Sequence, residues 1–268
     1  MAPSERARQV MTAARTDPAA AHRLAMWYVG GEEGLFQSPG LACRWSLQAA
    51  EGGHVDAQYN TGVYCLIGVG VTVDFEAAAT WFAKAAERGN RSAQYNLGVL
   101  LAQGKGTPQN YELAAQWYQR AADQGYSSAT SNLGGLYMAG HGVEQDHARA
   151  NTLYREAIEV DDVTTALFNL GTSYYNGTGV AMSLSTALSF WQRAADLGHA
   201  AAQRCIGWAY RHGEGGYARN IQLARQYIKA SAAQGEDKAV ALLKDWNACA
   251  HCSTASAPKV CKGCITTH

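Results

Sequence analysis

The pattern of apolar and polar residues repeats along the chain. Its clearest element is the block Ala-x-x-Asn-x-Gly, which recurs about every 36 residues. The block appears at 57–62, 93–98, 129–134 and 166–171, and a degenerate copy at 202–207 has Cys205 in place of the asparagine. A bulky residue keeps the same period at Trp45, Trp81, Trp117, Leu153, Phe190 and Tyr227. Two landmarks with one period predict an array of structural repeats.

Each repeat is predicted to contain two helices. Apolar residues between Ala77 and Ala86 recur at steps of three and four, as on the buried face of a second helix. Residues that can accept hydrogen bonds from a first turn precede this helix at Asp74, Asn110, Asp146, Ser183 and Asn220. Glycine stops follow it at Gly53, Gly89, Gly125, Gly198 and Gly235, whereas Asp161 stands at this position in one repeat. A Gly-x-Gly turn, such as Gly68 to Gly70, joins the two helices.

The block glycines fall inside the first helix, where glycine costs about 1 kcal/mol relative to alanine. Close approach of the second helix explains this repeated cost, with the Trp or Phe of that helix lying over the glycine. The period extends back to a weak unit with Met26 in the glycine position, and forward to 238–245 with Lys244 there. We therefore expect an N-terminal lead-in helix over 1–16 and an all-α solenoid over 17–248. The solenoid would comprise a weak first unit, five clear units and a C-terminal capping helix.

Composition narrows the functional classes. The 22 basic and 22 acidic residues balance, which argues against a broad nucleic-acid surface. No apolar run approaches the roughly 18 residues of a membrane span, and the N-terminus lacks the apolar segment of a signal peptide. We expect a cytoplasmic protein, with a nuclear location as the alternative.

Four cysteines near the end of the chain have metal-ligand spacing. They form two Cys-x2-Cys pairs, Cys249, Cys252, Cys261 and Cys264. Each pair can present two thiolates to one tetrahedral ion, so this segment is predicted to bind zinc. The alternative is structural disulfides or idle thiols. Cys43, Cys65 and Cys205 are scattered singly and are expected to be small buried apolar residues.

The repeated blocks resemble the Sel-one-like repeat family, a relative of the tetratricopeptide repeat, over roughly residues 17–248. The resemblance implies a right-handed superhelix of helix pairs that acts as a scaffold for protein partners. In the related fold, the first helices line a concave peptide-binding face. Carried over by position, the implied partner-binding residues are Tyr59, Asn60, Tyr95, Asn96, Asn132, Phe168, Asn169, Arg204 and Trp208. The alternative is that each asparagine bonds its own neighbouring turn and only orders the repeat.

The cysteine segment 249–268 resembles the opening of a MYND-type zinc finger. That family holds two zinc ions in a cross-braced arrangement and tends to grip short Pro-rich peptides. The sequence stops at His268 with only half of the ligands that the family needs. We therefore expect a truncated finger, and the alternative is that the four sulfurs bind one ion as a small ribbon.

No catalytic motif accompanies these features. The Gly-x-Gly turns follow predicted helices rather than strands and lack the context of a phosphate-binding loop. We predict a non-enzymatic adaptor that binds protein partners through the solenoid and zinc through the tail. The first alternative is a fragment of a larger MYND-containing protein, such as a lysine methyltransferase or a ubiquitin-pathway adaptor. A purely structural role in assembling complexes is the second.

Overall fold

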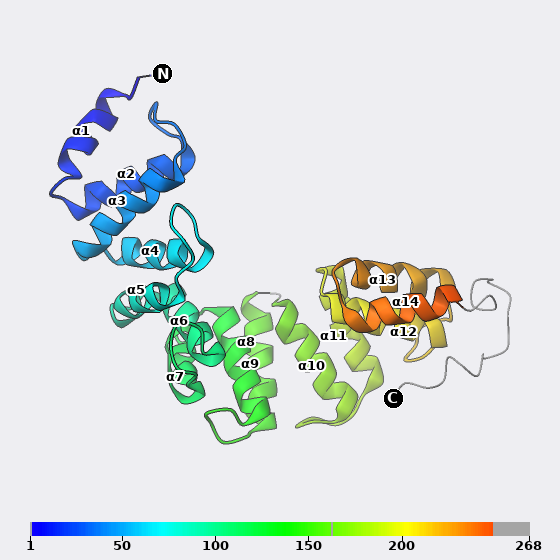
Figure 1. Ribbon diagram of the computed structural model, residues 1–268. Helices are drawn as coiled ribbons and strands as arrows, with labels where there is room; N and C mark the ends of the chain where they lie inside the picture. Colours follow the sequence, from blue (N-terminus) through cyan, green and yellow to red (C-terminus); the bar gives the residue numbers. More distant parts are fainter. Residues whose placement is uncertain (1, 162, 249–268) are drawn as a thin grey trace. The chain divides into compact units, whose positions relative to one another are not determined.

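The computed structural model describes residues 2–161 and 163–248, and these residues contain fourteen α-helices and no strand (Figure 1). The predicted all-α class is therefore confirmed for this part of the chain. The zinc-binding segment predicted over 249–268 lies outside the described residues. The chain divides into two compact units between Gln145 and Asp146, and each unit is described by itself.

The helices of each unit follow one another in pairs, and successive helices pack together (Figure 1). The first unit contains α1 (Glu5–Ala13), α2 (Pro18–Gly30), α3 (Pro39–Glu51), α4 (Val55–Ile67), α5 (Phe75–Glu87), α6 (Arg91–Gln103), α7 (Tyr111–Ala122) and α8 (Ser127–Ala139). The second unit contains α9 (His147–Val160), α10 (Thr164–Asn176), α11 (Leu184–Asp196), α12 (Ala200–His212), α13 (Ile221–Ala233) and α14 (Asp237–Ala248). Among these residues, no helix combines the length and the apolar character needed to cross a membrane.

The first helices of the repeats share one design. The helices α2, α4, α6, α8, α10 and α12 have 13 residues each, and each ends at a left-handed glycine with φ between 65° and 75°. Side chains are strained in that conformation, so glycine fixes where the helix ends. Because the helices have equal length, residues can be compared by their position within the first helix.

The second helices begin where the sequence predicts. Asp74, Asn110, Asp146, Ser183 and Asn220 each accept a hydrogen bond from the backbone N–H three residues later, at 2.8–3.3 Å. The predicted glycine stops adopt φ between 74° and 89°, whereas Asp161 has an extended φ of −146°. The predicted caps and stops are therefore confirmed.

The glycine at the eighth position of the first helix lies against the second helix of the same repeat. A Cβ atom added to Gly98 would lie 2.6 Å from a ring carbon of Tyr118, and one added to Gly62 would lie 2.7 Å from Phe82. Trp191 and Ile228 cover the corresponding glycines of the second unit. The expected close approach is confirmed, but the contact is made by the residue directly after each repeated landmark.

The first repeat corrects one register prediction. Alignment of α2 with α4 places Ala25, and not Met26, at the eighth position. Ala25 is 1% exposed and Met26 is 43% exposed, as this alignment requires. The corresponding position of α3 holds Ser46, a small buried residue that leaves room for the alanine methyl group. The loop of the first repeat is one residue longer, which the spacing of the blocks did not reveal.

Candidate interaction surface

The nine residues predicted to bind a partner all lie on first helices and are half-buried. They occupy the fifth, sixth and ninth positions, with Tyr59 and Asn60 on α4, for example, and Arg204 and Trp208 on α12. Half-buried positions pack against the scaffold on one side and remain accessible on the other. We call these residues the first-helix surface of each unit, with five of them in the first unit and four in the second.

In four of the repeats, the fifth residue of the first helix contacts the residue directly before the next even-numbered helix. The Tyr95 ring lies 5.0 Å from the Tyr126 ring, and the Phe168 ring stacks on His199 at 4.6 Å. Arg204 replaces the ring contact with an ion pair to Glu236 at 3.1 Å. We call this contact a joint, since it links successive repeats and fixes the side chains of the first-helix surface.

The asparagine at the sixth position also links repeats. The Asn169 amide donates to the Tyr154 hydroxyl of the preceding second helix at 3.4 Å. Asn132 makes side-chain hydrogen bonds with Tyr118 and Tyr95, and Asn96 makes one with Tyr59. These partners lie in the neighbouring repeat, whereas the structural alternative placed the bond in the asparagine's own turn.

A glutamine at the fourth position has a role that the sequence analysis missed. Gln58, Gln94 and Gln203 donate to carbonyl groups near the end of the preceding second helix, at 3.1–3.3 Å. The repeated Ala-Gln pair at the start of three blocks was the available signal for this role. The glutamine supplies a second donor to helix-end carbonyls that also accept from the backbone N–H of the following glycine stop.

Burial raises the pKa of three groups on this side of the repeats, two tyrosine hydroxyls and one thiol. It raises the pKa of the Tyr118 and Tyr154 hydroxyls to about 12, against the smaller opposite effect of hydrogen bonds from Asn132 and Asn169. It also raises the pKa of the Cys205 thiol to about 11. The asparagines and tyrosines therefore offer neutral hydrogen-bonding groups at physiological pH.

Three of the seven cysteines lie among the residues that the structure describes. Cys43 is buried as expected, but Cys65 and Cys205 are half-buried. Cys205 is the sixth residue of α12, the position that holds a half-buried asparagine in other first helices. All three carry free thiols. The predicted zinc ligands Cys249, Cys252, Cys261 and Cys264 lie outside the described residues.

Comparison with known proteins identifies the repeat. A family model described as the Sel1 repeat matches residues 18–54, 55–90, 91–126, 127–162, 164–199 and 200–236. None of the comparisons supports the MYND-type finger predicted at 249–268. A search of curated proteins gives no match.

Solved structures show the same fold. The chain is 31% identical to a Sel1 repeat protein from Oxalobacter formigenes, with a TM-score of 0.74 over 80% of this chain and 85% of that one. It is 30% identical to a protective antigen of uropathogenic Escherichia coli that displays an SLR fold, with a TM-score of 0.71 over 85% of this chain. The match covers 48% of the antigen, so this chain spans about half of its length.

A third structure supports the fold alone. It is a putative Sel1 repeat protein from Klebsiella pneumoniae, 23% identical, with a TM-score of 0.52 over 78% of this chain and all of that one. Sel1 repeat proteins are generally non-enzymatic scaffolds for protein interaction. Because the six matched segments run from residue 18 to residue 236 with a single residue between two of them, this chain belongs to the Sel1 repeat family.

Proposed function

We propose that this chain is an adaptor that binds an extended peptide segment of a protein partner along the first-helix surface of the first unit. The observation that supports this is the register of the surface. Half-buried aromatic and amide side chains recur at the same positions of successive first helices, and contacts between repeats hold them in place. A surface that is ordered before binding loses less conformational entropy when the partner docks.

The chemistry of the surface suits a peptide backbone. An asparagine amide can donate to a carbonyl and accept from an N–H, and the neighbouring aromatic ring adds apolar contact. The Asn60 amide contacts the Met26 sulfur at 3.7 Å, which is a weak acceptor. A peptide carbonyl would be a stronger acceptor for this amide.

A peptide-display selection against the full chain tests the proposal. Enriched peptides are synthesised, and their affinity is measured for the parent chain and for the variant Asn60→Ala/Asn96→Ala. Loss of two amide contacts should weaken binding at least tenfold. The control is Gln116→Ala, an exposed position of the second helix α7, which should leave the affinity unchanged.

Thermal melting separates binding from stability in this test. If Asn60→Ala/Asn96→Ala lowers Tm strongly, the asparagines act mainly by stabilising the packing between repeats. Equal affinity of the double variant and the parent for all enriched peptides would contradict binding at the first-helix surface.

We also propose that Cys249, Cys252, Cys261 and Cys264 bind zinc, with their spacing as support. Metal analysis of the purified chain should find zinc that is lost when the four residues are replaced by serine. One ion would favour a four-sulfur ribbon, and no cysteine-dependent ion would contradict the proposal. The MYND resemblance also implies a Pro-rich peptide ligand, which titration of the zinc-loaded chain with such a peptide would test.

A further inference from the structure

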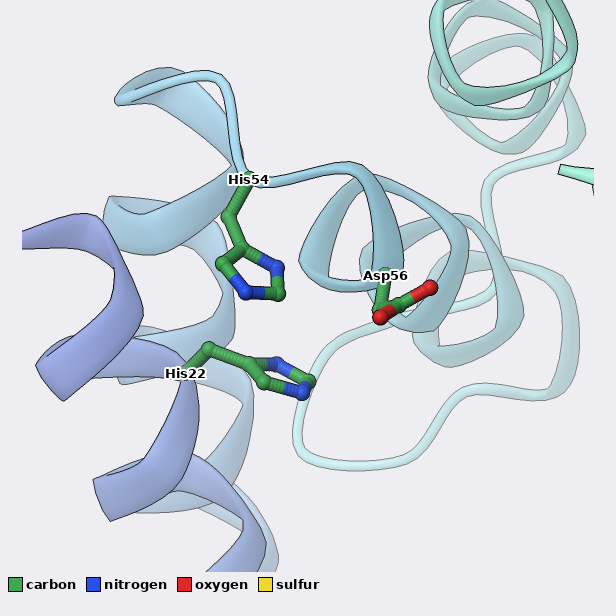
Figure 2. Close-up of side chains that lie close together, drawn as sticks. All are labelled: His22, His54 and Asp56. Atoms are coloured by element: carbon green, nitrogen blue, oxygen red, sulfur yellow. The ribbon is translucent and has the colours of Figure 1, made fainter. Parts of the chain in front are cut away.

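The joint between the first two repeats carries a different set of side chains from the others. His22 is the fifth residue of α2, and its ring stacks on His54 with centroids 4.3 Å apart and planes at 20°. Asp56 is the second residue of α4 and extends its carboxylate toward the two rings (Figure 2). One ligand atom from each of these three residues lies within 4.8 Å of the others.

The ring stack needs only one histidine. At the Phe168–His199 joint, a phenylalanine stacks on a histidine at 4.6 Å with the same 20° angle between planes. His199 accepts from the Ala202 N–H with Nδ1, as His54 does from the Ala57 N–H, both at 3.3 Å. The second imidazole at the first joint is therefore not required for stacking or for capping.

The carboxylate is also specific to the first joint. No other described helix that follows a joint has an acidic residue at its second position. The second position of α4 holds Asp56, and the equivalent residues of the later even-numbered helices are Ser92, Ser128, Thr165, Ala201 and Lys238. The repeat fold accommodates all of these residues. Two imidazoles and one carboxylate thus meet at the first joint. Among the described joints, this is the one at which all three positions carry a side chain that can bind a metal.

His22 has an unpaired ring nitrogen beside the other two side chains. Its Nδ1 atom is buried and has no hydrogen-bond partner within the part of the chain that the structure describes. An imidazole nitrogen without such a partner can offer its lone pair to a metal. Asn90 donates to Asp56 Oδ1 at 3.3 Å and orients the carboxylate from outside the cluster.

We propose that His22, His54 and Asp56 bind a divalent metal ion of the zinc type. Two imidazole nitrogens and one carboxylate oxygen form a ligand set that zinc accepts, with a fourth position left for water. Tetrahedral bonds of about 2.05 Å place ligand atoms roughly 3.4 Å apart, so the side chains must close by about 1.4 Å from the 4.8 Å limit.

Metal binding would also rearrange the stacked rings of His22 and His54 and remove the cap that His54 provides to α4. Imidazole lone pairs lie in the ring plane, so two parallel rings must rotate before both can point at one ion. Nδ1 of His54 accepts from Ala57, which leaves Nε2 for the metal. The proton on Nε2 must then move to Nδ1, and the Ala57 N–H loses its acceptor. Hydrogen exchange at the Ala57 amide should therefore increase when metal binds.

The experiment uses tag-free full-length protein in which the four tail cysteines are replaced by serine, so that tail thiolates cannot contribute. Zinc binding is measured at pH 7.5 by competition with a chromophoric chelator, with Mg²⁺ as a cation that prefers oxygen ligands. We expect one Zn²⁺ per chain, no competition by Mg²⁺, and a Co²⁺ spectrum without thiolate charge-transfer absorption. Zn²⁺ should also raise Tm.

The key variant is His22→Phe, because it recreates the Phe–His stack of the Phe168–His199 joint and removes one ligand. It should keep its Tm without metal and bind Zn²⁺ at least tenfold more weakly. Asp56→Asn, at an exposed position, is a second variant that does not depend on the stack and should also weaken binding at least tenfold. The matched control is His199→Asn, which removes a histidine from another joint and should bind Zn²⁺ as the parent does.

Three results would overturn the proposal. They are no zinc bound by the parent that lacks the four tail cysteines, equal zinc affinity of this parent and both variants, or an equal loss of affinity in His199→Asn.

Discussion

The close approach of the two helices in a repeat predicts the effect of one added methyl group. Gly98 lies in α6, and a Cβ atom placed on it would be 2.6 and 2.8 Å from two ring carbons of Tyr118. Carbon atoms normally approach to about 3.5–4.0 Å, so the overlap is roughly 1 Å. The change Gly98→Ala must therefore move either the Tyr118 ring or α7.

The size of the effect follows from two opposing terms. Alanine is favoured over glycine inside a helix by about 1 kcal/mol. Overpacking of a well-packed interior costs about 1–3 kcal/mol. Tyr118 is 3% exposed and is bonded to Asn132, so its ring has little room to move. We expect Gly98→Ala to lower the free energy of unfolding by about 1–2 kcal/mol.

Urea denaturation, monitored by tryptophan fluorescence, measures this change. Because a repeat array can unfold in parts, amide hydrogen exchange in α6 provides a local measurement as well. The control is Gly40→Ala in α3, where an added Cβ has nothing within 4 Å and should stabilise the chain slightly. In a Tyr118→Ala background, Gly98→Ala should become stabilising by about 1 kcal/mol. If Gly98→Ala stabilises the parent as Gly40→Ala does, helix contact does not explain the glycine.

Three further changes test the turns, the caps and the joints. Gly106 and Gly125 both have positive φ, but a Cβ on Gly106 would overlap the Phe75 carbonyl group whereas one on Gly125 meets open space. Gly106→Ala should therefore lower stability in urea by about 2 kcal/mol more than Gly125→Ala, and equal losses would argue against the overlap. Asn110→Ala should cost about 1 kcal/mol in the same assay because α7 loses its cap, while Asn110→Ser should cost little; a similar loss in both would contradict a capping role. Burial lowers the pKa of His199 below its usual 6.5, so the unfolded chain takes up the proton first and stability falls as the pH drops below 6.5. His199→Asn should therefore reduce the loss of stability between pH 7 and pH 5. An unchanged pH dependence would refute this.

Local signals in the sequence were sufficient for the caps and turns. A cap such as Asn110 acts within three residues of the chain, and a left-handed glycine such as Gly104 acts on its own backbone, so neither depends on distant packing. These features recur in every repeat and define the helix boundaries. The repeat period then assigned the fold, because each two-helix unit needs neighbours to bury its apolar side.

Packing between helices was harder to predict. Trp81 and Phe82 are adjacent and both apolar, and the helical period alone does not decide which of them faces Gly62. The structure selects Phe82, which is fully buried, and leaves Trp81 half-buried under the Lys84 ammonium group at 4.0 Å. The assignment of Met26 failed for a related reason, since one extra loop residue shifts the whole register.

The joints show why function is poorly visible in the repeat pattern. The same contact between a fifth residue and the residue before the next even-numbered helix is made by Tyr95 with Tyr126, by Phe168 with His199, and by Arg204 with Glu236. At these joints the same contact is made with different chemistry, so the fold does not prescribe which side chains make it. Side chains at the joints can vary without loss of the helix pairs, so they can acquire charge, hydrogen-bonding groups or metal ligands. Departures from the repeated block at the joints, such as His22 and Arg204, therefore mark positions where the chemistry differs from repeat to repeat, whereas the block itself places the asparagines of the first-helix surface.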